Sequence, residues 1–153
     1  MSILPIFIPH AGCPHQCVFC NQKTISGQKL AAVAGAKEQL VRWRSWLQPS
    51  AANEAAFYGG SFTGLPLELQ EELLALTDAL LAEGFIGSVR LSTRPDYIDE
   101  ERLQLLQRHG VRLVELGVQS LDDRVLAAAE RGHTAAQVAP AVALLKRFGF
   151  QVG

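Results

Sequence analysis

Residues 88–118 read SVRLSTRPDYIDEERLQLLQRHGVRLVELGV, and this stretch decides the fold. Two short apolar runs, Ser88 to Ser92 and Leu113 to Val118, have the length and composition of strands. A helical pattern lies between them from Asp99 to His109, and Gly110 stands where a C-terminal cap belongs. A strand, a helix and a strand in this order predict two parallel strands joined by a right-handed crossover.

The same alternation runs through the whole chain. Earlier strands are predicted at Ile3 to Pro9 and Ala55 to Tyr58, and Phe150 to Gly153 reads as the opening of a fifth strand. Helical patterns lie between and after these runs, over Lys37 to Leu47, Pro66 to Glu83, Asp99 to His109, Leu121 to Glu130 and Ala135 to Phe148.

Cap residues mark several of these helix ends. Ser120 with Asp123, and Thr134 with Gln137, have the spacing of capping boxes at the start of the last two helices. Pro66 suits a first helical turn, where its missing N–H costs nothing.

Repeated strand–helix units predict an α/β fold with a parallel sheet. A complete eight-unit barrel needs about 250 residues, so 153 residues supply only about half of one. We therefore expect a partial (β/α) barrel of about four β/α units plus the start of a fifth strand. Residues 1–153 would form one domain, the N-terminal portion of a truncated barrel, with an unpaired strand edge where the rest is missing.

Composition and charge restrict the class of protein. With 48% hydrophobic and 19% charged residues, the chain is typical of a globular domain and not of a disordered one. The net charge of −1 gives no global positive field for nucleic acid. Residues 1–50 carry +4, from five basic side chains and one acidic, whereas the remainder carries −5, from nine and fourteen. The basic side chains of the first part, which would serve an anionic ligand or an ordinary solvated helix face, are Lys23, Lys29, Lys37, Arg42 and Arg44.

The chain has no stretch that predicts a membrane span, which needs about 18 apolar residues without charge. The apolar N-terminus lacks the positively charged leader of a secretion signal, so we interpret it as mature protein. Three cysteines within eight positions are a poor disulfide framework, and a reducing cytoplasm fits them better.

Cys13, Cys17 and Cys20 form Cys-x3-Cys-x2-Cys directly after the first predicted strand. Three thiolates on one short loop can hold three corners of a cubane iron–sulfur cluster and leave one iron open to a small molecule. A structural zinc site is the main alternative, with His10 or His15 as the fourth ligand. A third reading is three buried thiols that act only as small hydrophobes.

The cysteine loop, with an aromatic residue before its last cysteine, resembles the cluster motif of the radical S-adenosylmethionine (radical SAM) enzymes. Four further motifs resemble, in order, the radical SAM domain of the Elongator catalytic subunit family and its bacterial relatives. They are Tyr-Gly-Gly-Ser-Phe-Thr at 58–63, Ser-Thr-Arg-Pro-Asp-Tyr-Ile at 92–98, Glu-Leu-Gly-Val-Gln-Ser at 115–120 and Arg-Gly-His-Thr at 131–134. The expected fold is therefore a partial barrel of radical SAM type.

The resemblance implies two cofactors and a class of reaction. Cys13, Cys17 and Cys20 would bind a 4Fe-4S cluster, whose open iron holds S-adenosylmethionine while an electron cleaves it to a 5′-deoxyadenosyl radical. The reaction would modify the wobble uridine of tRNA. Acetyl-coenzyme A (acetyl-CoA) would supply the added group through an acetyltransferase domain that this sequence lacks, and an electron donor would be needed.

The resemblance also implies cofactor-binding positions at the ends of the second and third strands. The turn Gly59, Gly60 and Ser61 would approach the amino end of the methionine, where a side chain would block the way. Ser92 and Arg94 would lie near the cofactor. Arg94 could pair with the methionine carboxylate or with an acidic side chain such as Asp96, and both possibilities stay open.

Three polar residues further along the chain complete the set. Glu115 and Gln119 stand four apart on the fourth predicted strand, so both should face the barrel interior, toward ribose hydroxyls or a cation such as Arg94 or Arg131. A buried structural ion pair is the competing interpretation of Glu115. Gln119 is the better cofactor candidate. Arg131 would reach the cofactor carboxylate, and no residue is assigned a catalytic role.

Two other functions fit the same sequence. One is a radical SAM enzyme acting on a different small-molecule substrate, since the scaffold hosts several reactions. The other is a non-catalytic zinc-binding fragment.

Overall fold

The computed structural model describes residues 2–8, 13, 15, 17–20 and 32–153. The predicted strand end at Pro9, the zinc candidate His10 and the basic residues Lys23 and Lys29 lie outside these ranges.

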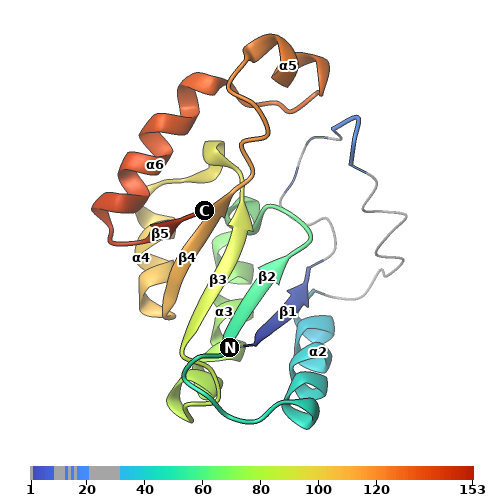
Figure 1. The fold of residues 1–153 in the computed structure, drawn as a ribbon, viewed down its shortest axis with the longest axis vertical. Coiled ribbons are helices and arrows are strands. Elements are labelled where there is room, and N and C mark those ends of the chain that lie inside the picture. Colours follow the sequence, from blue (N-terminus) through green and yellow to red (C-terminus); the bar gives the residue numbers. More distant parts are fainter. Residues whose placement is uncertain (1, 9–12, 14, 16, 21–31) are drawn as a thin grey trace.

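A five-stranded parallel sheet forms the centre of the domain (Figure 1). Its strands follow the chain in the order β1-β2-β3-β4-β5, as successive strand–helix units of a barrel do. Within the described residues the sheet is open, with β1 and β5 at its edges. The predicted partial (β/α) barrel is therefore confirmed. The strands are β1 (Ile3–Phe7), β2 (Glu54–Tyr58), β3 (Ser88–Thr93), β4 (Val111–Leu116) and β5 (Gln151–Val152).

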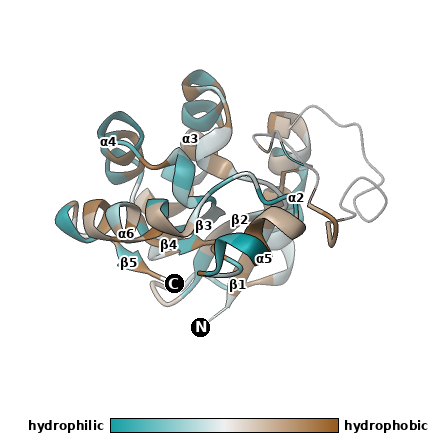
Figure 2. Ribbon diagram, turned by 90° about the horizontal axis from the view of Figure 1, so that it is seen from above, coloured by the Kyte–Doolittle hydropathy of each residue, from teal (hydrophilic) through white to brown (hydrophobic). Residues whose placement is uncertain are grey.

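Figure 2 shows α2, α3 and α4 side by side over one face of the sheet, and α6 packs beside β5. Short 3-10 turns follow β2 and β3 and precede α6. In the described ranges, no helix is long and apolar enough to cross a membrane. The helices are α2 (Ala32–Trp46), α3 (Leu67–Ala82), α4 (Glu100–Arg108), α5 (Asp123–Ala128) and α6 (Val138–Arg147), and the 3-10 turns are η1 (Phe62–Gly64), η2 (Pro95–Tyr97) and η3 (Ala135–Gln137).

The core lies between the sheet and these helices. Alternate strand residues point into it, because successive side chains of a strand face opposite sides. Fully or almost fully buried examples are Leu4, Ile6, Ala55, Phe57, Val89, Leu91 and Val114. The opposite face carries polar side chains on its middle strands, among them Glu54, Arg90 and Glu115.

The end of β4 differs from the prediction. The strand stops at Leu116, two residues before Val118, and the Gly117 N–H still donates to the Thr93 carbonyl at 2.8 Å. Beyond that point the chain turns out of the sheet, and Gln119 takes a left-handed backbone with a φ of 69°. The prediction that Gln119 lies on the fourth strand was wrong.

Helix boundaries differ mainly at N-termini. Asp122, not Ser120, caps α5 by accepting from Arg124 N–H at 2.8 Å, so the first capping box was wrong. The second is confirmed, because Thr134 N–H donates to Gln137 Oε1 at 2.8 Å. Pro66 directly precedes α3 instead of lying within it.

Candidate functional site

A cavity of about 470 Å³ opens at the carboxyl ends of β2, β3 and β4, where ligands of strand–helix folds bind. Ten of the eleven residues predicted for the site line it, and only Gly59 does not. The predicted members are Cys13, Cys17, Cys20, Gly60, Ser61, Ser92, Arg94, Glu115, Gln119 and Arg131. Thr93, at the predicted end of the third strand, also lines it, and so do four residues that had not been assigned to the site, Phe19, Leu116, Gly117 and Gly153.

The three cysteines share this cavity. Cys17 is buried, whereas Cys13 and Cys20 are partly exposed. In the part of the chain that the structure describes, no three His, Cys, Asp or Glu side chains are grouped so that they could hold one metal ion. A cubane does not need such a group, because each cysteine binds a different iron. The donor set therefore fits a cluster in its chemistry.

The glycine turn after β2 divides into two roles. Gly59 has a φ of 99°, and a Cβ there would lie 2.9 Å from the Ile8 carbonyl oxygen. This glycine therefore lets the turn approach the chain after β1 and does not face the cavity. Gly60 and Ser61 do line it, as predicted.

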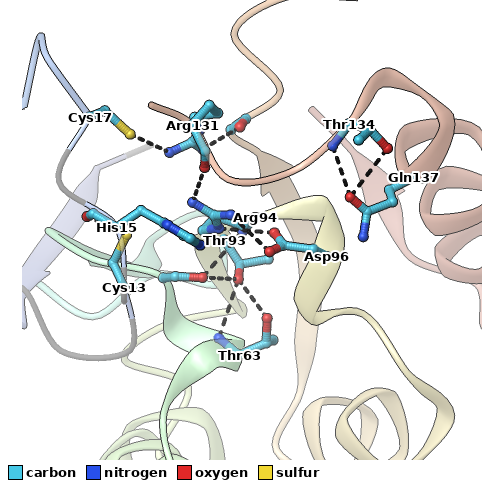
Figure 3. Close-up of polar contacts among 12 residues, drawn as sticks. Cys13, His15, Cys17, Thr63, Thr93, Arg94, Asp96, Arg131, Thr134 and Gln137 are labelled. Carbon is cyan, nitrogen blue, oxygen red and sulfur yellow. Dashed lines mark hydrogen bonds and ion pairs between the residues drawn. The ribbon is translucent and has the colours of Figure 1, made fainter. Parts of the chain in front are cut away.

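A cluster of hydroxyls fixes the same turn from β3. Thr93 Oγ1 lies 2.9 Å from Ser61 Oγ and 2.5 Å from Thr63 Oγ1, and it accepts from Thr63 N–H at 3.3 Å (Figure 3). All three side chains are buried. These contacts of Thr93 were not predicted, because a hydroxyl at a strand end gives no sign in the sequence of which turn it will contact.

Arg94 is buried beside the cavity and takes one of the two partners left open. It donates through Nε and Nη2 to the two Asp96 carboxylate oxygens at 2.9 and 2.8 Å, and through Nη1 to the Arg131 carbonyl at 2.6 Å. Burial acts to lower the pKa of Arg94, but Asp96 and, after it, Cys13 together outweigh burial, so the pKa is raised. Burial likewise acts to raise the pKa of Asp96, and the Arg94 guanidinium holds it below its usual value.

Arg131 lies between the end of β4 and Cys17. Its Nη1 donates to Cys17 Sγ at 3.6 Å and its Nη2 to the Gly117 carbonyl, while its Nε has no hydrogen-bond partner among the residues that the structure describes. No ion pair joins Arg131 to a carboxylate within the described residues. A buried guanidinium in this state is suited to an anionic ligand.

The cation beside Glu115 is Arg90, so the expected pairing with Arg94 or Arg131 was wrong. Arg90 Nη2 donates to Glu115 Oε1, and Nη1 donates to Glu54 Oε2 at 3.1 Å. Ser92, opposite Glu115 in the β3–β4 register, donates to Glu115 Oε2 at 3.0 Å. Arg90 pairs with Glu115 because it stands on the same face of the neighbouring strand, whereas Arg94 and Arg131 lie beyond the strand ends.

His133 is buried next to this site at 4% exposure. No group among the described residues meets hydrogen-bond geometry with either ring nitrogen. Burial, followed by the charges of Arg131 and Arg94, lowers the pKa of His133, and Asp96 and the Val118 backbone only partly oppose this. The ring is therefore held neutral between the two arginines.

Comparisons with known proteins agree with this geometry. A family model described as the Radical SAM superfamily matches residues 7–153. Elongator complex protein 3 of Saccharomyces cerevisiae is 30% identical over 117 residues, which cover 65% of this chain and 21% of that protein. The tRNA uridine(34) acetyltransferase of Methanocaldococcus infernus is 24% identical over 190 residues, covering 99% of this chain and 36% of that protein.

The same fold occurs among solved structures. The archaeal Methanocaldococcus infernus Elp3 with an N-terminal deletion superimposes with a TM-score of 0.67 at 20% identity, over 99% of this chain and 36% of that one. The chain thus spans about a fifth to a third of the length of these relatives.

Proposed function

The chain belongs to the Radical SAM superfamily, and from this we propose that it binds a 4Fe-4S cluster and S-adenosylmethionine in the cavity at its strand ends. One observation carries the proposal: three thiols from one short loop share a cavity with polar side chains from three strand ends. The chemistry that the cluster supplies when bound is the electron that cleaves S-adenosylmethionine to methionine and a 5′-deoxyadenosyl radical.

The protein's own residues would bind and orient these groups. Cys13, Cys17 and Cys20 would hold the cluster, and Gly60 with Ser61 would let the methionine approach the β2 turn closely. Arg131, whose Nε finds no partner in the described part of the chain, supplies positive charge to this end of the cavity.

The remaining polar groups would hold the nucleoside part. On the β3–β4 face, Glu115 presents carboxylate oxygens and Ser92 a hydroxyl group, and Gln119 lies past the end of β4. Ribose hydroxyls are suitable partners for such groups. Arg94, by contrast, donates to Asp96 and to the Arg131 carbonyl and also interacts with Cys13, so its role is to support the site.

Anaerobic reconstitution with iron and sulfide tests the cluster. The chain should gain a broad visible absorption, and added S-adenosylmethionine should change the electron paramagnetic resonance (EPR) spectrum of the reduced cluster. Cys17→Ser should abolish both, whereas Val18→Ser, in the same loop but exposed, should abolish neither. A colourless protein that binds zinc instead would contradict the proposal, and so would a spectrum that S-adenosylmethionine leaves unchanged.

We also propose wobble-uridine modification of tRNA in the cytoplasm as the reaction, with acetyl-CoA and an electron donor as partners of the complete enzyme. The support is the similarity of this chain to the tRNA uridine(34) acetyltransferase of Methanocaldococcus infernus. The reconstituted chain should form 5′-deoxyadenosine faster with a tRNA carrying uridine 34 than with the same tRNA carrying cytidine. Equal rates with an intact cluster would favour a different substrate.

A further inference from the structure

The segment between α5 and η3 contacts the cysteine loop through three residues, Ala129, Arg131 and Gly132. Val18 N–H donates to the Ala129 carbonyl at 3.2 Å, and Arg131 Nη1 donates to Cys17 Sγ at 3.6 Å. The His15 ring lies against Gly132. We call Ala129 to His133 the docking segment. Its contacts join parts of the chain that are 114 residues apart in the case of Arg131 and Cys17 (Figure 3).

Gly132 leaves no room for a side chain at this junction. A Cβ on Gly132 would lie 2.3 Å from His15 Nε2 and 2.4 Å from two other atoms of the ring. Its φ of 77° also falls in the left-handed region that favours glycine. The loop and the docking segment are therefore fitted to each other by shape.

The docking segment is itself tied to the sheet. Arg131 donates to the Gly117 carbonyl at the end of β4, and its own carbonyl accepts from Arg94 Nη1 at 2.6 Å. Gly117 makes room for this arginine, because a Cβ there would lie 2.8 Å from Arg131 Nη2. Displacement of the segment would break contacts to both β3 and β4 ends.

We propose that the docking segment positions the cysteine loop, with Gly132 and Arg131 as positioning residues that set the place of Cys17. A loop ordered before it binds loses less conformational freedom on binding, so docking would favour cluster assembly. That consequence rests on the proposed function, whereas the docking is a property of the polypeptide alone.

The test uses the metal-free, reduced chain. The chain is treated with iodoacetamide, and the alkylation rate of each cysteine is followed by mass spectrometry of the peptides. Cys17, only 4% exposed, should react slowest in the wild type. Gly132→Ala should raise the alkylation rate of Cys17 about tenfold, which corresponds to a loss of about 1.4 kcal/mol in the free energy of docking. The alkylation rates of Cys13 and Cys20 should change less.

Two further variants separate docking from a general loss of stability. Gly149→Ala places a Cβ at a φ of 83° with nothing within 4 Å, so it carries a similar backbone cost and should leave the Cys17 rate unchanged. Gly132→Ala combined with His15→Ala removes the ring that the new methyl group meets, and the Cys17 rate should return toward that of the wild type. Arg131→Met should raise the Cys17 rate without rescue by His15→Ala.

Equal acceleration in Gly132→Ala and Gly149→Ala would overturn the proposal, as would a failure of His15→Ala to rescue. The iron content and EPR spectrum of the same variants report separately on the cluster. If the wild type assembles no cluster but the alkylation pattern holds, docking stands and the proposed function fails. If the cluster forms but the alkylation rates do not change, the proposed function stands and docking fails.

Discussion

Arg94 and Asp96 form a two-bond ion pair beneath the cavity, with N–O distances of 2.9 and 2.8 Å and side chains that are 2% and 14% exposed. Both charges belong to the short turn that follows β3, so the pair fixes the direction of the chain as it leaves the strand. It also keeps a buried guanidinium satisfied while Arg131 faces the thiols.

Asp96→Asn should destabilise the fold by about 3–5 kcal/mol, because it leaves the Arg94 charge buried without its counter-ion. Urea unfolding followed by circular dichroism measures the change. Asp78→Asn is the matched control: Asp78 is 48% exposed and its partner is His109, so its loss should cost less than about 1 kcal/mol. Equal costs for the two variants would contradict a structural role for the buried pair.

His133 predicts a loss of stability on mild acidification. Its pKa is lowered in the folded state by burial and by the neighbouring Arg131 and Arg94, so the unfolded chain takes up the proton first. The contribution of the neutral ring to the free energy of unfolding is complete above the ordinary histidine pKa of about 6.5. It decreases as the pH drops below that value, by at most about 1.4 kcal/mol per pH unit. Urea midpoints between pH 7.5 and 5 should therefore slope for the wild type and flatten in His133→Phe.

A second loss of folding stability should appear at lower pH, and it should remain in the His133→Phe variant. The pKa of Asp96 is lowered, so its contribution is present above the ordinary carboxyl range and is lost as the pH falls below it. Asp96→Asn should remove this decrease of the urea midpoint at acidic pH and keep the decrease that begins near pH 6.5. A wild-type midpoint that is flat from pH 7.5 to 5 would contradict the lowered pKa of His133.

The sequence predicted the sheet because its signals are local. Strand runs, helical periodicity and the C-cap at Gly110 each depend on neighbouring residues, and Gly110 has the expected positive φ of 70°. The site residues followed from their positions at strand ends, since parallel strands bring their carboxyl ends to one edge.

What the sequence could not give were partners across the sheet. Glu115 was matched to arginines beyond the strands because register is invisible in one chain, and Arg90 looked like an ordinary strand residue. Gln119 was placed on β4 because nothing local shows that the strand ends at Leu116, before the left-handed turn. The packing of His15 on Gly132 depends on a contact across more than a hundred positions and could not be foreseen.

Thr93→Val should weaken cofactor binding more than it weakens the fold. It removes the hydroxyl shared by Ser61 and Thr63, leaving buried polar groups unsatisfied at a cost of about 1–3 kcal/mol, and it frees the turn that we propose holds the methionine. An EPR titration of the reconstituted chain should give a Kd for S-adenosylmethionine at least about tenfold higher.

Thr77→Val is the control for that experiment. Thr77 is equally buried, but its hydroxyl donates only to the Leu74 carbonyl within α3. It should change the urea midpoint and leave the Kd unaltered. If both variants weaken S-adenosylmethionine binding to the same extent, the Thr93 hydroxyl has no special role in holding the turn.

Glu115→Gln should lower the pKa of Tyr58. In the folded chain that pKa is raised, first by burial and next by the negative charge of Glu115, while Arg90 opposes the shift. With a neutral amide at 115, burial still acts, but the charge is gone and Arg90 keeps its full effect, so the phenol should ionise at lower pH. Tyrosinate absorbance during alkaline titration measures this in a Tyr97→Phe background, where Tyr58 is the remaining tyrosine.

Glu54→Gln should give a smaller change in the same direction, since Glu54 is the weakest of the influences that raise the Tyr58 pKa. A larger effect from Glu54 would mean that the Arg90 side chain is shared differently between the two carboxylates in solution.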